Sequence, residues 1–121
     1  MTGTTLITDR VRPILADTTV DGTERWSNAL LMIWANDGTQ LIVTFRPESL
    51  LVIALTLGSF DEISVLTDDL SIGDRYQGAL ADYICGRALG QDGQNRVDKK
   101  RSDAFLKSFL VKAGLPQTAL E

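Results

Sequence analysis

Large apolar residues recur at steps of three and four positions in two segments of the chain, residues 25–47 and 73–93. In the first segment these residues are Trp26, Leu30, Ile33 and Trp34, and in the second they are Tyr76, Leu80, Tyr83 and Ile84. Residues with this spacing share one face of an α-helix, so each segment predicts an amphipathic helix with a buried apolar face. We expect these helices over about residues 24–46 and 74–90, which indicates a mainly α fold.

The first of these helices has two possible ends. Thr23 or Ser27 can cap its start, because a hydroxyl side chain at that position accepts a backbone N–H. The turn signal at residues 36–38, followed by the β-branched run 39–45, allows a strand that pairs with residues 49–57. The alternative is a helix that continues through Leu41 and Phe45 and ends before Pro47. The residue pattern alone leaves both interpretations open.

The second helix has clearer limits. Ser71 or Asp74 can cap its start, and the glycine-rich residues 90–93 are expected to end it. Gly86 and Gly90 are four residues apart and therefore lie on one helical face. Without side chains, they are expected to let a neighbouring element approach the backbone closely.

Two further helices are expected near the ends of the chain, over about residues 5–16 and 95–113. Pro13 removes one hydrogen bond from the first, which predicts a kink or a late start. The apolar stripe of the second consists of Val97, Phe105, Phe109 and Ala113. Gly114 is expected as its C-terminal cap and Pro116 prevents its continuation, so the tail 114–121 is expected to be extended and able to reach a neighbour.

The middle of the chain predicts the β element. Residues 50–66 are rich in β-branched and apolar side chains and contain Gly58, which is typical of a hairpin or an extended arm. The expected fold is therefore a small helical bundle with a short inserted β-hairpin or arm and an extended C-terminal tail.

Length and cysteine content fit one domain. A chain of 121 residues can form a single core without disulfides or a metal, so residues 1–121 are expected to fold as one unit. Cys85, the one cysteine, is interpreted as a small buried hydrophobe. The N-terminal residues have no signal-peptide pattern and no apolar run is long enough to span a bilayer. We therefore expect a protein made and kept, or assembled, in a cytoplasm and not associated with a membrane.

Charge is unevenly distributed along the chain. Residues 1–73 carry ten acidic and four basic side chains, and residues 74–121 carry six acidic and eight basic ones, giving net charges of −6 and +2. The basic cluster consists of Arg96, Lys99, Lys100 and Arg101, and is interleaved with Asp98 and Asp103. Sequence-specific recognition of duplex DNA needs a stronger basic footprint and is not expected. An acidic surface past which DNA slides remains compatible with this charge.

Catalytic chemistry is poorly supported. The chain has no histidine, the commonest general base. The acidic pairs at residues 61–62 and 68–69 lack the spaced loop that calcium binding needs, and no glycine-rich phosphate loop is present. We expect no enzyme activity, no cofactor and no metal.

Several residues together resemble a known family. The order is Arg25-Trp26, a helix, Asn36-Asp37, Arg46-Pro47, and then Tyr76, Ala79, Leu80, Tyr83, Arg87, Ala88 and Asp92. This order resembles the small head-to-tail adaptor proteins of tailed bacteriophages, also called connector or head-completion proteins. The resemblance implies one helix from Trp26 to Phe45. Pro13 and the short region from Glu48 to Gly73 differ from the family pattern.

The resemblance also implies a function. Such adaptors are structural virion proteins that form a ring, commonly dodecameric, beneath the portal protein at the neck of the virion. The ring extends the channel through which double-stranded DNA passes without sequence-specific binding, and it provides a platform for tail or stopper proteins. Assembly takes place in the host cytoplasm.

Two sets of residues are candidates for contacts in such an assembly. The candidates for the interface between subunits are Trp26, Trp34, Phe45, Leu51, Ile53, Leu55 and Phe60. The candidates for docking on the portal form the tail, Leu115, Pro116, Gln117, Thr118, Ala119, Leu120 and Glu121. The alternative function is a small cytoplasmic helical module that binds a protein or nucleic acid as a monomer or dimer.

Overall fold

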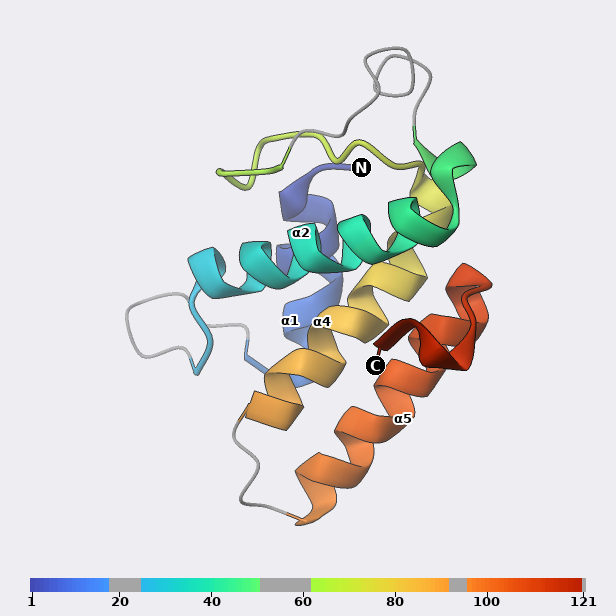
Figure 1. The fold of residues 1–121 in the computed structure, drawn as a ribbon. Coiled ribbons are helices and arrows are strands. Elements are labelled where there is room, and N and C mark those ends of the chain that lie inside the picture. The colour runs from blue at the N-terminus through green and yellow to red at the C-terminus, as the bar shows by residue number, and fades with distance from the viewer. Residues whose placement is uncertain (18–24, 51–61, 92–95, 121) are drawn as a thin grey trace.

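A computed structural model describes residues 1–17, 25–50, 62–91 and 96–120 (Figure 1). Three long helices dominate it: α2 (Asn28–Phe45), α4 (Gln77–Gln91) and α5 (Arg96–Ala113). The N-terminal residues form the π-helical segment η1 (Thr4–Val11), which continues into α1 (Arg12–Leu15). The prediction of a mainly α bundle is confirmed.

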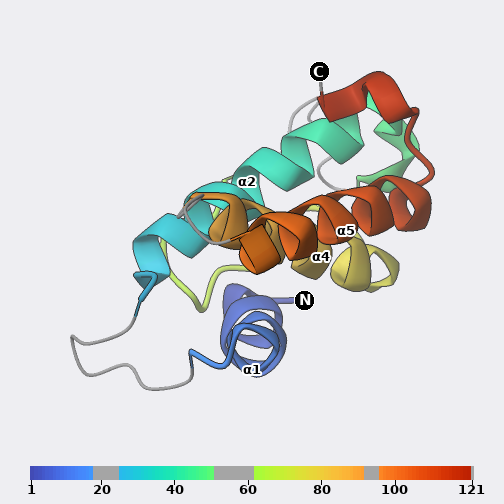
Figure 2. The ribbon, with the colours of Figure 1, turned by 90° about the horizontal axis from the view of Figure 1, so that it is seen from below.

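Helix α4 lies at the centre of the bundle. It packs against α5, α2 and η1, and Figure 2 shows α1 below the layer formed by the longer helices. Ten of its residues are buried, including Leu80, Tyr83 and Ile84. Because neighbours cover α4 on several sides, polar side chains are confined to a narrow part of its surface.

Helix α2 runs without interruption through the predicted turn at residues 36–38, so the strand alternative is wrong. Gly38 is needed for packing: a Cβ there would lie 2.9 Å from Tyr83 Cδ1 and 3.0 Å from Leu80 Cδ2 of α4. Asn36 also has a tertiary role, because its amide exchanges two hydrogen bonds of 3.0 Å with the backbone of Ile63. Both residues look like turn formers in the sequence but make contacts with distant segments.

The prediction of the N-terminal cap is correct for α2 and wrong for α4. Ser27 caps α2, since its Oγ accepts the Leu30 N–H at 3.2 Å. The prediction of Ser71 or Asp74 as a cap is wrong: α4 is preceded by the 3-10 turn η3 (Asp74–Tyr76), whose N-cap is Gly73 with no side-chain bond. The Asp74 carboxylate instead accepts the N-terminal ammonium at 2.7 Å.

The irregularity expected at Pro13 appears as a change of helix type. The Arg12 N–H bonds to Ile7 O, five residues earlier, and the following turn is α-helical up to Leu15. Ala16 then ends the segment in the left-handed conformation, with φ of 55°. The π-helical backbone and the missing donor of Pro13 therefore coincide at the place where a kink is predicted.

The C-terminal end of α5 is the predicted glycine cap. Gly114 has φ of 69°, and the N–H groups of Gly114 and Leu115 bond to Val111 O and Leu110 O at 3.2 and 2.9 Å. This pair of bonds is a Schellman motif. The prediction of an extended tail is wrong, because residues Gln117–Leu120 form the 3-10 turn η4 and Leu115 and Ala119 are buried against the subunit.

The predicted β arm is only partly described. Residues 51–61, which include most of it, lie outside the described residues. At its described ends there is no strand: Leu50 forms one isolated antiparallel bridge with Ile72, and a second bridge joins Thr2 and Asp69. Residues 62–73 lie along the top of η1 and α2 in Figure 1 and are held there by hydrogen bonds with Gly3, Thr4 and Asn36.

Candidate functional site

The two tryptophans cannot form an interface between subunits in this fold. Trp26 and Trp34 are only 2% and 5% exposed, so the prediction that they contact a neighbouring subunit is wrong. The Trp26 carbonyl accepts Arg12 Nη2 at 3.0 Å, and the Arg25 guanidinium lies 4.4 Å from the Trp26 ring centroid. The large apolar surfaces of both residues are buried within the subunit, where they pack the N-terminal segment and α2 against the bundle.

Phe45 is the described interface candidate that remains accessible. It is 43% exposed at the last residue of α2. The other candidates, Leu51, Ile53, Leu55 and Phe60, lie outside the described residues.

The tail offers about half of its residues for docking. Leu115 and Ala119 are buried, whereas Pro116, Gln117, Thr118 and Leu120 are exposed. Glu121 lies outside the described residues. The tail is therefore a folded turn with one exposed side, and not the extended segment of seven residues that the sequence predicts.

Arg46 fixes this turn relative to Phe45. Its Nη2 and Nε donate to the Gly114 carbonyl at 2.7 and 3.2 Å, and its Nη1 lies 3.7 Å from the Glu48 carboxylate. Two donors of one planar guanidinium on one carbonyl hold the ends of α2 and α5 together. The sequence identifies Arg46 only as part of the Arg-Pro pair and gives no sign of this contact.

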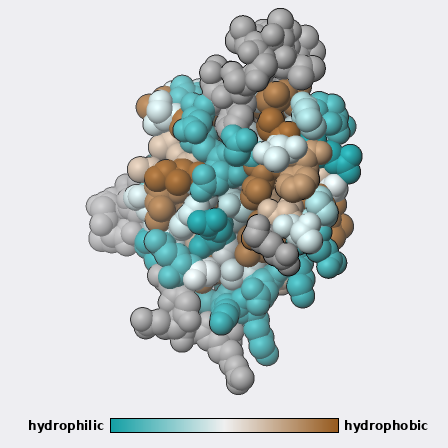
Figure 3. All heavy atoms as spheres, in the orientation of Figure 1, coloured by the Kyte–Doolittle hydropathy of each residue, from teal (hydrophilic) through white to brown (hydrophobic). Residues whose placement is uncertain are grey.

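Exposed apolar side chains occur at separate places on the surface. Val111 is 81% exposed, Ile33 54% and Val65 52%, and Ile14 and Leu120 are exposed to a smaller degree. Figure 3 shows the apolar atoms on one face of the molecule as separate clusters with hydrophilic atoms between them. Leu41 and Leu120 line one hollow there, and Phe45 follows Leu41 by one helical turn. We call Leu41, Phe45, Leu120 and the exposed residues Pro116, Gln117 and Thr118 the tail face.

A second hollow lies beside Val111 on α5. It has a volume of about 650 Å³ and is lined by Lys107, Leu110, Val111, Leu115 and Gln117. Three of these side chains are apolar, and Lys107 provides a cation at the edge. Leu115 lines this hollow because the tail folds back, so the hollow depends on the tail conformation.

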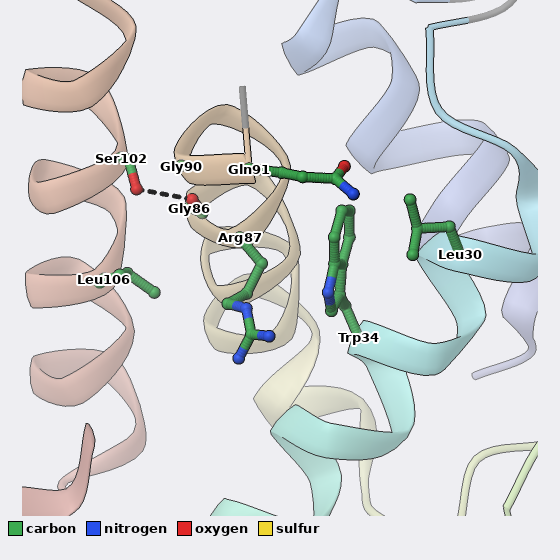
Figure 4. Close-up of a pocket in the computed structure, with 8 residues that line it drawn as sticks. All are labelled: Leu30, Trp34, Gly86, Arg87, Gly90, Gln91, Ser102 and Leu106. Atoms are coloured by element: carbon green, nitrogen blue, oxygen red, sulfur yellow. Dashed lines mark hydrogen bonds between the residues drawn. The ribbon is translucent and has the colours of Figure 1, made fainter. Parts of the chain in front are cut away.

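A third hollow, of about 460 Å³, lies between α2, α4 and α5 (Figure 4). Trp34 stands between α2 and α4, and Ser102 Oγ donates to the Gly86 carbonyl at 2.6 Å. A Cβ on Gly86 would lie 2.8 Å from Leu106 Cγ, and one on Gly90 would lie 2.8 Å from Ser102 Oγ. The prediction that these glycines allow close approach is confirmed.

Helix α4 carries three further polar groups, Cys85, Tyr83 and Asp82, that are buried in the bundle. Burial raises the pKa of the Cys85 thiol to about 12, and burial also raises the pKa of Tyr83. The Tyr83 hydroxyl accepts Arg87 Nη1 at 3.0 Å. The buried Asp82 carboxylate accepts Ser108 Oγ at 2.7 Å and Lys112 Nζ at 2.8 Å, which joins α4 to α5. These groups act in packing, and a thiol with a raised pKa is a poor nucleophile.

In the part of the chain that the structure describes, no three histidine, cysteine or carboxylate side chains are close enough to share a metal ion. No helix there is long and apolar enough to cross a membrane.

One polar centre is missing from the sequence predictions. Arg12 is buried, and its guanidinium donates to Asp17 Oδ2 at 3.1 Å and to Asn28 Oδ1 at 2.5 Å. Asp17 also accepts the backbone N–H groups of Arg25 and Trp26 at 3.0 and 3.2 Å. This network fixes the start of α2, and its sequence signal is only an arginine in an otherwise apolar helical face.

Comparison of the chain with protein-family models, curated proteins and solved structures gives no match. The functional conclusion therefore depends on the residues and surfaces described above.

Proposed function

We propose that the protein is a structural subunit of a bacteriophage virion, a head-to-tail adaptor that forms a ring beneath the portal. In this role it extends the DNA channel and provides a docking platform for tail or stopper proteins at the virion neck. The observation that carries the proposal is the tail face, where Leu41 of α2 and Leu120 of the C-terminal turn line one hollow and Phe45 is exposed one helical turn after Leu41.

The composition of the tail face suits a protein partner. Phe45 and Leu120 are exposed, and Leu41 is partly buried beside them. Asp37, Gln40 and Arg87 line the same hollow and place polar groups around the apolar centre. An apolar centre with a polar rim is the usual anatomy of a protein–protein interface. The tail face is our candidate for the surface that contacts the portal.

The folded tail changes how docking would occur. Leu115 and Ala119 are buried in the subunit, so they are available to a portal only if the tail unfolds from it. Docking through the exposed side of the turn needs no such change. Because Arg46 holds Gly114, Phe45 and the turn can engage the portal as one rigid unit.

The test is sedimentation of the purified chain with portal rings encoded in the same genome. We expect the chain to sediment with the portal as one large, discrete complex. The variants Phe45→Glu and Leu120→Glu place a charge in the apolar centre and are expected to weaken this complex by tenfold or more, since a buried unpaired charge costs at least about 1.4 kcal/mol.

Ile14→Glu is the matched control. Ile14 is 38% exposed, similar to Leu120, but it lies on α1. Its complex with the portal should be unchanged. A chain that stays at the size of the free subunit in the mixture, at concentrations well above micromolar, contradicts the adaptor proposal and favours a free-standing binding module.

A further inference from the structure

The outer face of α5 has no covering element among the described residues. Val111 is 81% exposed there, and Lys100, Ala104 and Lys107 lie on the same stripe because they precede it by eleven, seven and four residues. Lys99 and Arg101 are also exposed next to this stripe. Among the exposed charged side chains from residue 99 to residue 107, Asp103 is the only acidic one, so the face is basic around an apolar residue.

The hollow beside Val111 is a concave site on this face that can receive a side chain of a partner. Leu110 and Leu115 form apolar walls, and Lys107 lies at the edge. Its volume of about 650 Å³ is ample for one aliphatic side chain with part of its backbone. A partner suited to this face should present a small apolar side chain surrounded by carboxylates.

The segment 62–74 of this chain has those properties. Val65 is 52% exposed. The segment contains the carboxylates of Glu62, Asp68, Asp69 and Asp74 and has no basic side chain. The N-terminal ammonium pairs with Asp74. We call this segment the acidic turn.

Internal hydrogen bonds hold Val65 in a fixed position. Asp68 Oδ2 accepts the N–H groups of Ser64 and Val65 at 2.9 and 3.2 Å, and the Asp68 N–H donates to Val65 O at 3.1 Å. The backbone of the turn is tied to η1, because the N–H of Thr4 donates to Leu66 O at 2.8 Å. A side chain presented by a rigid turn loses little conformational entropy on binding.

The acidic turn and the outer face of α5 lie on opposite sides of the subunit. In Figure 1 the yellow-green segment that contains residues 64–68 lies above α2, and α5 lies on the far side of α2 and α4. One subunit therefore cannot join its own two surfaces. Two different surfaces on opposite sides can, however, join successive copies, and such a contact produces a ring or an open chain.

We propose that copies of this chain associate head to tail, with the acidic turn of one copy on the outer face of α5 of the next and Val65 in the hollow beside Val111. This inference rests on the proposed function in that it identifies the contact between neighbouring subunits of the ring. The charges of the two surfaces are complementary, and the apolar contact lies at their centre. Because charged side chains surround that contact, the association weakens as the salt concentration rises.

Two charge-reversal variants test the contact without portal protein. The first, Lys100→Glu with Lys107→Glu, makes the outer face of α5 acidic. The second, Glu62→Lys with Asp69→Lys, leaves two lysines against the Asp68 carboxylate, because Asp74 is paired with the N-terminal ammonium. The turn thus becomes weakly basic, and Asp68 stays in place to hold it. Sedimentation velocity at low and high salt measures the size of each chain. The unaltered chain should form species larger than a monomer at low salt, and each variant alone should not.

An equimolar mixture of the two variants is the decisive sample. In the mixture the basic turn of the second variant faces the acidic α5 of the first, and the unaltered turn of the first faces the unaltered α5 of the second. Both contacts are again complementary, so assembly should return. Recovery also demonstrates that both variants are folded. A mixture that remains monomeric overturns the proposal, as does an unaltered chain that stays monomeric at low salt up to the millimolar range.

The control is Asp9→Lys, which reverses one exposed carboxylate. Asp9 is exposed on η1, outside both surfaces and outside the tail face, so this variant should assemble as the unaltered chain does. Val65→Ser and Val111→Ser should each weaken assembly about tenfold, which corresponds to the lost burial of one valine. Assembly unaffected by these two changes contradicts the placement of Val65 in the hollow.

The two proposals fail in different ways. If the charge-reversal results hold but no complex with the portal forms, the head-to-tail contact stands and the adaptor function is wrong. If the portal complex forms and the charge reversals have no effect on self-association, the adaptor function stands and the contact is wrong.

Discussion

At the scale of single residues, Gly86 determines how closely α5 approaches α4. A Cβ at this position would lie 2.8 Å from both Leu106 Cγ and Leu106 Cδ2, and 3.3 Å from the Ser102 carbonyl oxygen. Neither the branched carbon of a leucine in a helix interface nor a backbone oxygen can move away easily. The packing of α5 against α4 therefore requires a glycine at this position, and Gly86 does not form a turn.

Gly86→Ala should lower the free energy of unfolding by about 1–2 kcal/mol, because the overpacking cost exceeds the gain in helix propensity. Gly78→Ala on the same helix is the control. Its new Cβ would meet Arg10 Nη2 at 3.2 Å, the end of a flexible side chain, so stability should stay the same or rise by up to about 1 kcal/mol. Urea unfolding measures both, and equal losses would contradict the packing argument.

Cys85 gives a second prediction at this scale. Burial raises its thiol pKa to about 12 from an ordinary value of 9.0, so folding favours the protonated thiol. This contribution to stability is fully present below pH 9.0 and is lost as the pH rises towards 12. At pH 8 a thiol reagent should therefore label the native chain far more slowly than the chain in denaturant. Equal rates would place the thiol at the surface.

At the scale of elements, local signals decide where α2 begins. Ser27 accepts the Leu30 N–H, a contact over three residues, and Ser27 is one of the two caps that the sequence predicts. Ser27→Ala should lower the free energy of unfolding by about 1 kcal/mol, and Ser27→Asp, which keeps an acceptor, should preserve it. Thermal or urea unfolding distinguishes the two, and an equal loss in both variants would indicate that the cap has no role.

The acidic turn is the second element whose stability can be tested. Hydrogen bonds from the backbone N–H of Ser64 and then of Val65 lower the pKa of Asp68 below its ordinary value of 3.8. The turn is therefore favoured above pH 3.8 and is lost as the pH falls through the lower native value. In Asp68→Asn the amide N–H groups of Ser64 and Val65 should exchange with solvent faster than in the unaltered chain, as NMR can measure. The amides of α4 should be unaffected, and unchanged exchange at the turn would contradict this role.

At the scale of the whole molecule, the tail is part of the fold. Leu115 is buried and lines the hollow beside Val111, whereas Leu120 is exposed at the end of η4. Leu115→Ala should lower the free energy of unfolding by about 1–2 kcal/mol, and Leu120→Ala should change it by less than about 0.5 kcal/mol. A free, extended tail would make both substitutions neutral, so this pair of measurements decides between the two conformations.

The candidate assembly surfaces were only partly predictable. Phe45 continues an apolar helical face in the sequence and remains accessible at the end of α2. Val65 and Val111 look like ordinary apolar residues, because nothing in their local spacing distinguishes them. Their importance in the proposal comes from a hollow and a rigid turn that exist only when distant segments are packed together.

Features that depend on a few consecutive residues could be predicted from the sequence: the helical segments, Ser27 as one of two possible caps, and the Gly114 stop. The packing of distant segments is what makes α2 cross the turn signal at residues 36–38, buries both tryptophans and folds the tail back. The physical reason is the range of the interactions. Caps and stops are hydrogen bonds within one helical turn, whereas Gly38 and Asn36 are held in a helix by Tyr83 and Ile63, far away in the chain.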